Sequence, residues 1–372
     1  MKILVVHDAD VNRFPPVLNL IECLSQNNYE TIIYAKDASK IVQRMNLPNV
    51  QFVPMDSADK CGKLKKVVKY LKRKPTIKKT VRKLMQECDI IWTTTDGTVR
   101  EIGKQLLQYK HVMQLMELIE HMPMLPVLAW PYMNIKKYAR HAYKVVVPEY
   151  NRAHIQKTWW KLKEVPVVLP NKPYKLPVLE SIPDELENIK PIISQMNKEK
   201  RRILLYQGVF YADRNLDKIA DAVDKLSDRY VLYIMGRKTD YREELLSRHS
   251  NIVAVPYIDP PYHMFITKNA HIGLTPYVAK KFLRYSILNA LYCAPNKIFE
   301  YAGNGLPMLG SNVPGLDIPF ERYNIGKCYE DNEDSIVECL EYIDKNYDEM
   351  SRNCYKYFNS IDMDEIVNSI LR

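Results

Sequence analysis

Short apolar runs alternate with helical stretches along the chain, the pattern of a doubly wound parallel sheet. The first series predicts strands at Ile3–His7, Thr31–Tyr34, Val50–Val53, Ile90–Thr93, Val112–Leu115 and Lys144–Val147. The second series predicts strands at Ile203–Tyr206, Val231–Met235, Ile252–Val255, His271–Leu274 and Met308–Gly310. Helices are predicted at Val17–Gln26, Tyr150–Trp160, Glu180–Lys200 and 335–372. The pattern therefore indicates an α/β protein with two Rossmann-like domains.

The domain organisation follows from the length and from a proline-rich segment between the two series. At 372 residues the chain favours two domains, each large enough to bury its own core. We predict an N-terminal Rossmann-like, acceptor-binding domain at 1–165 and a C-terminal Rossmann-like, donor-binding domain at 166–350. Residues 351–372 are expected to form a helix that packs back on the N-terminal domain. Two such domains are expected to bind ligands in a cleft at the carboxyl ends of their strands.

Composition narrows the class of protein. Apolar residues make up 47% of the chain, which favours a globular fold over disorder. No apolar run approaches the roughly 20 residues that a membrane-spanning helix needs, and the N-terminus reads as a buried strand rather than a signal peptide. The seven cysteines are scattered and contain no Cys-x-x-Cys pair, which argues against a disulfide framework or a zinc site and for a reducing cytosol.

The formal net charge of +10 is concentrated between Lys60 and Lys83, where basic residues occur without a single acid. Apolar residues are interleaved with them at roughly helical spacing, so the segment is predicted to bind an anionic membrane surface. The residues expected to do so are Lys65, Lys66, Lys69, Lys72 and Arg73. A solvated helical face is the alternative. Nucleic acid is not expected as a partner, because no recognised nucleic-acid-binding motif accompanies the charge.

The segment Tyr292–Pro307 predicts one short helix with both ends marked. A proline suits the first turn, Gly305 suits the left-handed residue past the end, and Pro307 prevents continuation. Asn296, Lys297 and Glu300 share a polar face. A helix with such a face offers free N–H groups to a phosphate and a carboxylate one turn deeper.

The same segment resembles the donor-binding segment of GT-B glycosyltransferases, in particular glycosyltransferase family 4 of the capsule, lipopolysaccharide and exopolysaccharide type. The resemblance implies that Glu300 binds the ribose hydroxyls of a sugar nucleotide, and it places Pro295, Asn296 and Lys297 among the donor-binding residues. The family usually carries a second glutamate eight residues earlier, where this chain has Tyr292. The segment therefore specifies the nucleotide better than the sugar.

The second domain carries three further matches to this family. A strand, a glycine loop and a helix start at 205–216 resemble its phosphate loop, with Arg214 in the position that contacts the diphosphate and Val209 where an arginine is common. The resemblance assigns further donor-binding residues at the ends of neighbouring strands. These are Gly208, Gly236, Arg237, Tyr257 and Thr275.

The first domain offers candidates for acceptor binding and catalysis. Asp8 and Arg13 follow the first strand, and Asp96 and Gly97 follow a later one, so all four are expected to bind the acceptor. Asp8 and Asp10 form an Asp-x-Asp sequence, but a metal site is not expected there. The family often has a histidine or acid after the strand Val112–Leu115, which makes Glu117 and His121 catalytic candidates beside Arg214. A structural role is the alternative for each.

The resemblance implies a glycosyltransferase that moves a sugar from a UDP- or GDP-linked donor to a glycan acceptor, expected to be lipid-linked. It implies retention of configuration, no metal and no other cofactor, with the leaving diphosphate stabilised electrostatically. The expected location is the cytoplasm, peripheral on the inner face of the cell membrane. A nucleotide-sugar epimerase on the same fold and a non-catalytic nucleotide- or membrane-binding partner are the alternatives.

Overall fold

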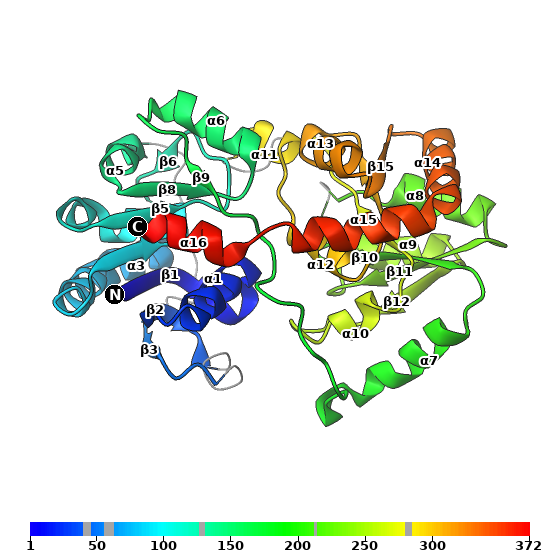
Figure 1. Cartoon of the computed structure of the whole chain (residues 1–372), viewed down its shortest axis with the longest axis horizontal. Helices are drawn as coiled ribbons and strands as arrows, with labels where there is room; N and C mark the ends of the chain where they lie inside the picture. The colour runs from blue at the N-terminus through cyan, green and yellow to red at the C-terminus, as the bar shows by residue number, and fades with distance from the viewer. Residues whose placement is uncertain (40–45, 56–62, 126–130, 212–213, 280–284) are drawn as a thin grey trace. The chain divides into compact units, whose positions relative to one another are not determined.

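The protein is represented by a computed structural model that describes residues 1–39, 46–55, 63–125, 131–211, 214–279 and 285–372, without the side chains of 63–71. The chain forms two compact units (Figure 1). Unit 1 comprises residues 1–174, 281–289 and 362–372, and unit 2 comprises 175–280 and 290–361. Each unit contains one parallel sheet covered by helices, so the predicted α/β class is confirmed.

Unit 1 is built on a seven-stranded parallel sheet in the order β3-β2-β1-β4-β5-β8-β9. Its strands are β1 (Lys2–Asp10), β2 (Glu30–Asp37), β3 (Val50–Pro54), β4 (Ile90–Thr93), β5 (His111–Gln114), β8 (Lys144–Val147) and β9 (Val167–Val168). A separate hairpin pairs β6 (Met122–Pro123) with β7 (Tyr132–Met133). The helices of the unit are α1 (Pro15–Gln26), α3 (Lys63–Leu84), α4 (Asp96–Ile102), α5 (Ile135–His141), α6 (Tyr150–Trp160) and α16 (Met363–Leu371), with 3₁₀ turns η1 (Val11–Arg13) and η2 (Gly103–Gln108).

Unit 2 is built on a six-stranded parallel sheet in the order β12-β11-β10-β13-β14-β15. Its strands are β10 (Arg202–Gln207), β11 (Tyr230–Met235), β12 (Ile252–Val255), β13 (Ile272–Thr275), β14 (Met308–Ser311) and β15 (Gly326–Tyr329). Its helices are η3 (Asp184–Ile189), α7 (Lys190–Lys198), α8 (Asp217–Lys225), α9 (Asp240–Arg248), α10 (Met264–Thr267), α12 (Asn296–Gly303), α13 (Pro314–Tyr323), α14 (Glu333–Lys345) and α15 (Tyr347–Asn359). The short α11 (Leu288–Leu291) lies where the chain passes between the units.

The sheet of unit 2 is buried on both faces, as a parallel sheet requires. Along β10, Ile203 and Leu205 pack in one core cluster, whereas Leu204 and Tyr206 pack in another. Helices α12 and α15 supply apolar side chains to the first cluster, and α8 and α14 supply them to the second. Alternate residues of each strand therefore meet helices on opposite faces.

All eleven predicted strands are present, within a few residues of their predicted bounds. Sequence reasoning missed β15 (Gly326–Tyr329), whose residues are only partly apolar and half-buried in the middle. The proline-rich segment between the two series, 165–174, was interpreted as a strand-like hinge between domains, and part of it is β9, which pairs with β8 in the first sheet.

The observed division of the chain differs from the predicted domain boundaries. Because β9 belongs to the first sheet, the chain stays in unit 1 through Tyr174 instead of leaving it at residue 165. The helix predicted for 351–372 is two helices, of which α15 belongs to unit 2 and α16 to unit 1. The apolar face of α16 is buried, and Asn27, the residue after α1, donates a hydrogen bond to Asp364.

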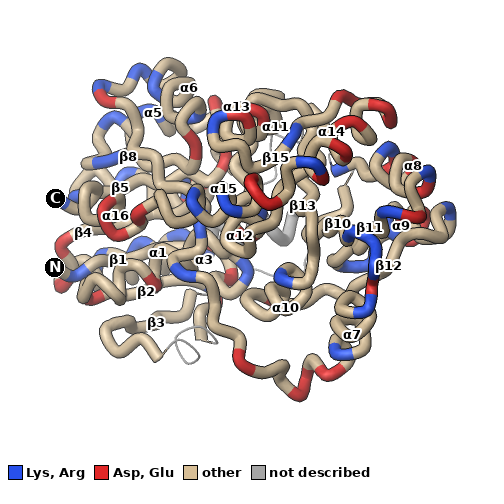
Figure 2. Tube along the Cα trace, turned by 45° about the vertical axis from the view of Figure 1, so that its right-hand side comes forward, with Lys and Arg blue, Asp and Glu red and all other residues tan. Residues whose placement is uncertain are grey.

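From Lys63 onward the basic segment lies in α3, where Figure 2 marks the Lys and Arg positions along the trace, and Lys60 falls outside the described residues. In the half whose side chains are described, Ile77 and Val81 are buried in the core of unit 1, so they are not available to a membrane. Arg73 is also turned inward and pairs with the buried Glu101 of α4, and membrane binding by this residue stays a prediction. Lys72 is exposed. No helix in the described ranges is long and apolar enough to cross a bilayer.

Candidate functional site

The candidate site in unit 2 lies where its strand order reverses, between β10 and its neighbours β11 and β13. Parallel sheets bind ligands beside the carboxyl ends of the strands at such a switch point. Here β10 ends at Gln207, which Gly208 follows, and β13 ends at Thr275. Helix α12, which comes between β13 and β14, carries Glu300.

Two glycines let the loops at this edge pack closely. Gly208 has a φ of +145° and donates its N–H to the carbonyl of Met235 at 3.0 Å. A Cβ on Gly236 would lie 2.2 Å from the carbonyl oxygen of Gly208. The close approach that the structure shows at Gly236 is to the Gly208 loop, and donor binding by Gly236 stays a prediction.

Lys297 lies against the Gly208 loop. Its Nζ is 4.3 Å from the ring centroid of Tyr206, and a Cβ built on Gly208 would be 3.1 Å from it. The hydroxyl of Tyr206 donates to the carbonyl of Val209 and so fixes the ring under the lysine. Lys297 thus supplies positive charge to the Gly208 loop.

Helix α12 has the ends that the sequence predicted. Pro295 is its N-cap, with an extended backbone, and no side chain in the described ranges caps this terminus. Beyond its end, Gly305 has a φ of +69°, the left-handed conformation that glycine adopts most easily. The N–H groups of the first turn, including that of Asn296, therefore point out of the helix without a capping side chain.

Glu300 is a buried carboxylate at the centre of the site. Its side chain is 11% exposed, Gln207 Nε2 donates to Oε2, and His263 Nε2 lies 3.4 Å from the same oxygen. Burial alone would raise the pKa of Glu300, but His263, Gln207 and the nearby charge of Lys297 outweigh it and lower the pKa below its usual value of 4.5. Glu300 is therefore an ionised hydrogen-bond acceptor at neutral pH.

Sequence reasoning missed Gln207, His263 and Thr267. Gln207 is buried and accepts a hydrogen bond from the Thr267 hydroxyl at 2.7 Å. A polar residue at the end of an apolar strand was the available signal for Gln207. His263 and Thr267 carry no comparable signal, because only the folded chain brings α10 beside α12.

The other predicted donor-binding residues form two cation–π pairs. The Arg214 guanidinium lies 3.7 Å from the ring centroid of Tyr277, and that of Arg237 lies 4.4 Å from the ring centroid of Tyr257. Tyr257 is 40% exposed, so part of its ring can meet a ligand. Thr275 is fully buried, and its hydroxyl donates to the carbonyl of Leu309 at 3.5 Å, so donor binding by this residue stays a prediction.

Three of the predicted acceptor-binding residues lie together in unit 1, at the carboxyl end of β1 and the start of α4. Asp8 Oδ1 accepts hydrogen bonds from the hydroxyls of Thr95 at 2.6 Å and Thr98 at 3.3 Å. A Cβ on Gly97 would lie 2.2 Å from Asp8 Oδ2. These contacts fix the start of α4, and Asp96 beside them is buried. Acceptor binding by these residues stays a prediction.

Arg13 and the two unit 1 catalytic candidates have separate partners. The exposed Arg13 pairs with Asp10 at 3.3 Å. Glu117 Oε2 accepts a hydrogen bond from Asn289 Nδ2 at 2.8 Å, whereas His121 stacks on Tyr132 at 4.9 Å. No contact in the described ranges joins Glu117 to His121. In those ranges, no group of three or more His, Cys, Asp or Glu side chains is arranged to hold a metal ion.

His7, at the end of β1, is a buried neutral histidine. The Thr94 hydroxyl donates to the carbonyl of Val6 at 3.1 Å, so it accepts from His7 Nδ1 at 2.7 Å. Nε2 is then a buried acceptor that has no hydrogen-bond partner among the described residues. Burial lowers the pKa of His7 from its ordinary 6.5 to about 4, and that of His111 to about 3.

These histidines predict an acid-sensitive unit 1. Between pH 6.5 and about 4 these histidines are protonated in the unfolded chain but remain neutral in the folded chain. The free energy of unfolding therefore falls as the pH falls, by at most ~1.4 kcal/mol per pH unit for each histidine. From pH 7 to pH 5, wild type is expected to lose about 2 kcal/mol more than His7→Asn. Urea unfolding followed by tryptophan fluorescence measures this, since all four tryptophans lie in the sequence of unit 1. Equal losses in both proteins would contradict the assignment to His7.

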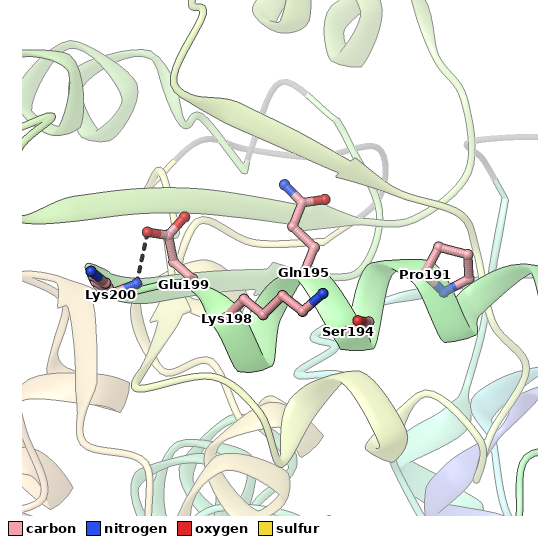
Figure 3. Close-up of a pocket in the computed structure, with 6 residues that line it drawn as sticks. All are labelled: Pro191, Ser194, Gln195, Lys198, Glu199 and Lys200. Carbon is pink, nitrogen blue, oxygen red and sulfur yellow. Dashed lines mark hydrogen bonds between the residues drawn. The ribbon is translucent and has the colours of Figure 1, made fainter.

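An open groove of about 640 Å³ runs along α7 in unit 2 (Figure 3). Its lining includes Ser194, Gln195 and Lys198, and Glu199 there accepts a hydrogen bond from the Lys200 N–H at 3.0 Å. None of the predicted site residues lines this groove. It is separate from the residues gathered around Glu300.

Comparison with solved structures establishes the architecture. Anabaena HepE in complex with UDP matches with a TM-score of 0.69 at 12% identity, over 100% of this chain and 98% of that one. A glycosyltransferase from Rickettsia africae matches with a TM-score of 0.64 at 14% identity, over 100% and 96% of the two chains. The chain has the GT-B fold. A protein described as a putative UDP-N-acetylglucosamine 2-epimerase from Listeria monocytogenes also matches, with a TM-score of 0.61 at 14% identity, over 100% of this chain and 94% of that one.

Comparison of the sequence alone gives no match. No protein-family model matches it, and a search of the curated proteins finds no relative. At these identities the structural matches show the GT-B fold and leave the assignment to glycosyltransferase family 4 as a prediction.

Proposed function

We propose that this protein is a glycosyltransferase that binds a nucleotide-sugar donor on unit 2. The observation that carries the proposal is the ionised, buried Glu300 carboxylate, one turn into a helix whose N-terminus no described side chain caps. A desolvated carboxylate binds a pair of hydroxyls strongly, because hydrogen bonds to charged groups are stronger than neutral ones. The ribose of a nucleotide offers such a pair. The complexes of HepE with UDP and UDP-glucose support this ligand class.

The diphosphate of the donor would lie at the start of α12. The N–H groups of its first turn, the Lys297 ammonium and the Arg214 guanidinium all favour negative charge. As the bond to the sugar breaks, charge develops on the leaving diphosphate, and these groups stabilise it. The departing phosphate itself can accept the proton of the attacking hydroxyl. This mechanism proceeds with retention of configuration and needs no metal ion, as proposed here for this chain.

The acceptor is proposed to be a glycan, lipid-linked, in polysaccharide biosynthesis at the cytoplasmic face of the membrane. Calorimetric titration with UDP, GDP and dTDP tests the donor proposal, and release of nucleotide from the matching sugar nucleotide tests transfer. Turnover that requires membranes containing the native acceptor would support a transferase. Binding of none of the three nucleotides would overturn the proposal, and binding without turnover on those membranes would indicate a non-catalytic protein.

A nucleotide-sugar epimerase is the second candidate, favoured by the match to the Listeria protein. An epimerase interconverts donors and needs no acceptor. Incubation with a sugar nucleotide alone, followed by product analysis, separates the two reactions. A second sugar nucleotide formed without acceptor would establish epimerisation, and unchanged donor would favour transfer.

The lysines of the first part of α3, up to Lys72, predict salt-sensitive binding of the protein to anionic vesicles. Each cation near such a surface contributes about 1 kcal/mol, so replacing Lys65, Lys66, Lys69 and Lys72 by glutamine is expected to weaken binding at least ~100-fold. Arg73 is left unchanged in this variant, because its replacement would remove the ion-pair partner of the buried Glu101. Sedimentation with phosphatidylserine vesicles at low salt measures the effect.

The matched control replaces four exposed lysines outside α3, Lys137, Lys163, Lys198 and Lys200, by glutamine. Equal losses in the two quadruple variants would show that net charge alone, rather than the α3 segment, causes the binding. Undiminished binding of the α3 variant would make the segment a solvated face.

A further inference from the structure

The two interactions of the Glu300 carboxylate end on the same oxygen. Gln207 Nε2 donates to Oε2, and His263 Nε2 is 3.4 Å from Oε2. A carboxylate oxygen offers two lone-pair directions, and the hydrogen bond from Gln207 and the approach of His263 both fall on Oε2. Oε1 accepts no hydrogen bond from any residue in the described ranges. The carboxylate is therefore asymmetric, with one oxygen used by the protein and the other left for a ligand.

Gln207 is itself held in a defined orientation. The Thr267 hydroxyl, which is fully buried, donates to Gln207 Oε1 at 2.7 Å. Since an ionised carboxylate only accepts, the amide must turn its Nε2 toward Glu300 and its Oε1 toward Thr267. The hydroxyl also lies 3.2 Å from the carbonyl of His263, one turn earlier in the chain. Strand β10, helix α10 and helix α12 thus each contribute one side chain to a single hydrogen-bonded chain.

We propose that Gln207, held by Thr267, is a positioning residue that fixes Glu300 so that Oε1 receives the ribose hydroxyls of the nucleotide. Gln207 does not touch the ligand in this arrangement. It restricts the rotation of the carboxylate and contacts Oε2 together with His263. The orientation of Oε1 toward the ligand is therefore fixed. The proposal rests on the proposed nucleotide site of unit 2 and deepens it.

The test compares two ligands that differ only in the hydroxyls that Glu300 would bind. UDP and 2′,3′-dideoxy-UDP are titrated calorimetrically against the full chain, with GDP and its dideoxy analogue used if the chain binds guanine nucleotides. Gln207→Leu removes the N–H donor at similar size. Its Kd for UDP is expected to rise about tenfold, because one charge-assisted contact is no longer positioned. Its Kd for the dideoxy analogue is expected to change less than about twofold.

Two further variants keep the proposal falsifiable. Thr267→Val leaves Gln207 in place but releases its Oε1, and it is expected to weaken UDP binding about threefold without affecting the dideoxy analogue. The matched control is Gln156→Leu, which removes a fully buried amide of unit 1 that donates to the carbonyl of Ile119 at 2.9 Å. Its nucleotide affinities are expected to equal those of wild type.

The outcomes distinguish a failure of the proposed nucleotide site from a failure of the positioning role of Gln207. If wild type binds neither UDP nor GDP, the proposed function fails and the inference fails with it. If wild type prefers UDP over the dideoxy analogue but Gln207→Leu weakens both ligands equally, the nucleotide site stands and the positioning role is overturned. Selective loss of UDP in both Gln207→Leu and Thr267→Val supports the proposal.

Discussion

Replacing Glu300 by glutamine is expected to weaken nucleoside diphosphate binding about 10- to 100-fold. The change keeps the shape of the side chain but removes its charge, and a hydrogen bond to a charged group contributes about 1.5–3 kcal/mol. The substituted amide would also bring an N–H group among the donors of Gln207 and His263. Calorimetric titration with UDP or GDP measures the loss.

The control for this prediction is Glu338→Gln, a loss of the same charge at an exposed position of α14. It preserves the net charge of the test variant, so long-range electrostatic effects on the anionic ligand are matched. A loss of less than about threefold in Glu300→Gln would contradict a direct contact between Glu300 and the nucleotide.

Gly273→Ala is expected to destabilise unit 2 by about 3 kcal/mol, at the upper end of the usual cost of overpacking a core. Gly273 lies in β13, and a Cβ there would be 2.3 Å from the ring of Tyr301. The ring has no room to retreat, since Tyr301 is fully buried and its hydroxyl donates to the carbonyl of Leu205 at 3.0 Å. Urea unfolding followed by far-ultraviolet circular dichroism measures the change.

A double-mutant cycle tests the physical cause of that loss. Tyr301→Ala alone is expected to cost about 3–5 kcal/mol because it leaves a cavity. In the Tyr301→Ala background, however, Gly273→Ala should cost less than about 1 kcal/mol, since its Cβ then has space. Additive losses would show that the ring does not determine the requirement for glycine at this position.

The sheets were predictable because their strands are nearly continuous apolar runs buried on both faces. Strand β10 and strand β13 carry this signal, whereas β15 does not, because Lys327 and Cys328 in its middle are only half-buried. Segment α3 shows the limit of such patterns. An amphipathic helix was predicted correctly, but periodicity alone does not say whether its apolar face meets a membrane or, as Ile77 and Val81 show, the protein core.

The candidate site was predictable only in part, for a related reason. Glu300, Lys297 and the glycine loop lie within local motifs whose spacing suggests their chemistry. His263 and Thr267 belong to a separate segment, and they reach Glu300 only because α10 packs beside α12. Interactions of this kind depend on tertiary structure, and no local pattern encodes them. For Gly236 and Thr275 the structure adds packing contacts that no local pattern indicated, and their donor binding stays a prediction.

The return of α16 to unit 1 has a consequence for the order of events during synthesis. Residues 362–372 are translated after the whole of unit 2, yet their buried apolar face and the hydrogen bonds of Asp364 and Asn368 belong with α1. Domains otherwise tend to fold in the order in which they leave the ribosome. In this chain unit 1 is synthesised first but cannot complete its folding, because part of α1 stays uncovered until α16 has been synthesised after the whole of unit 2.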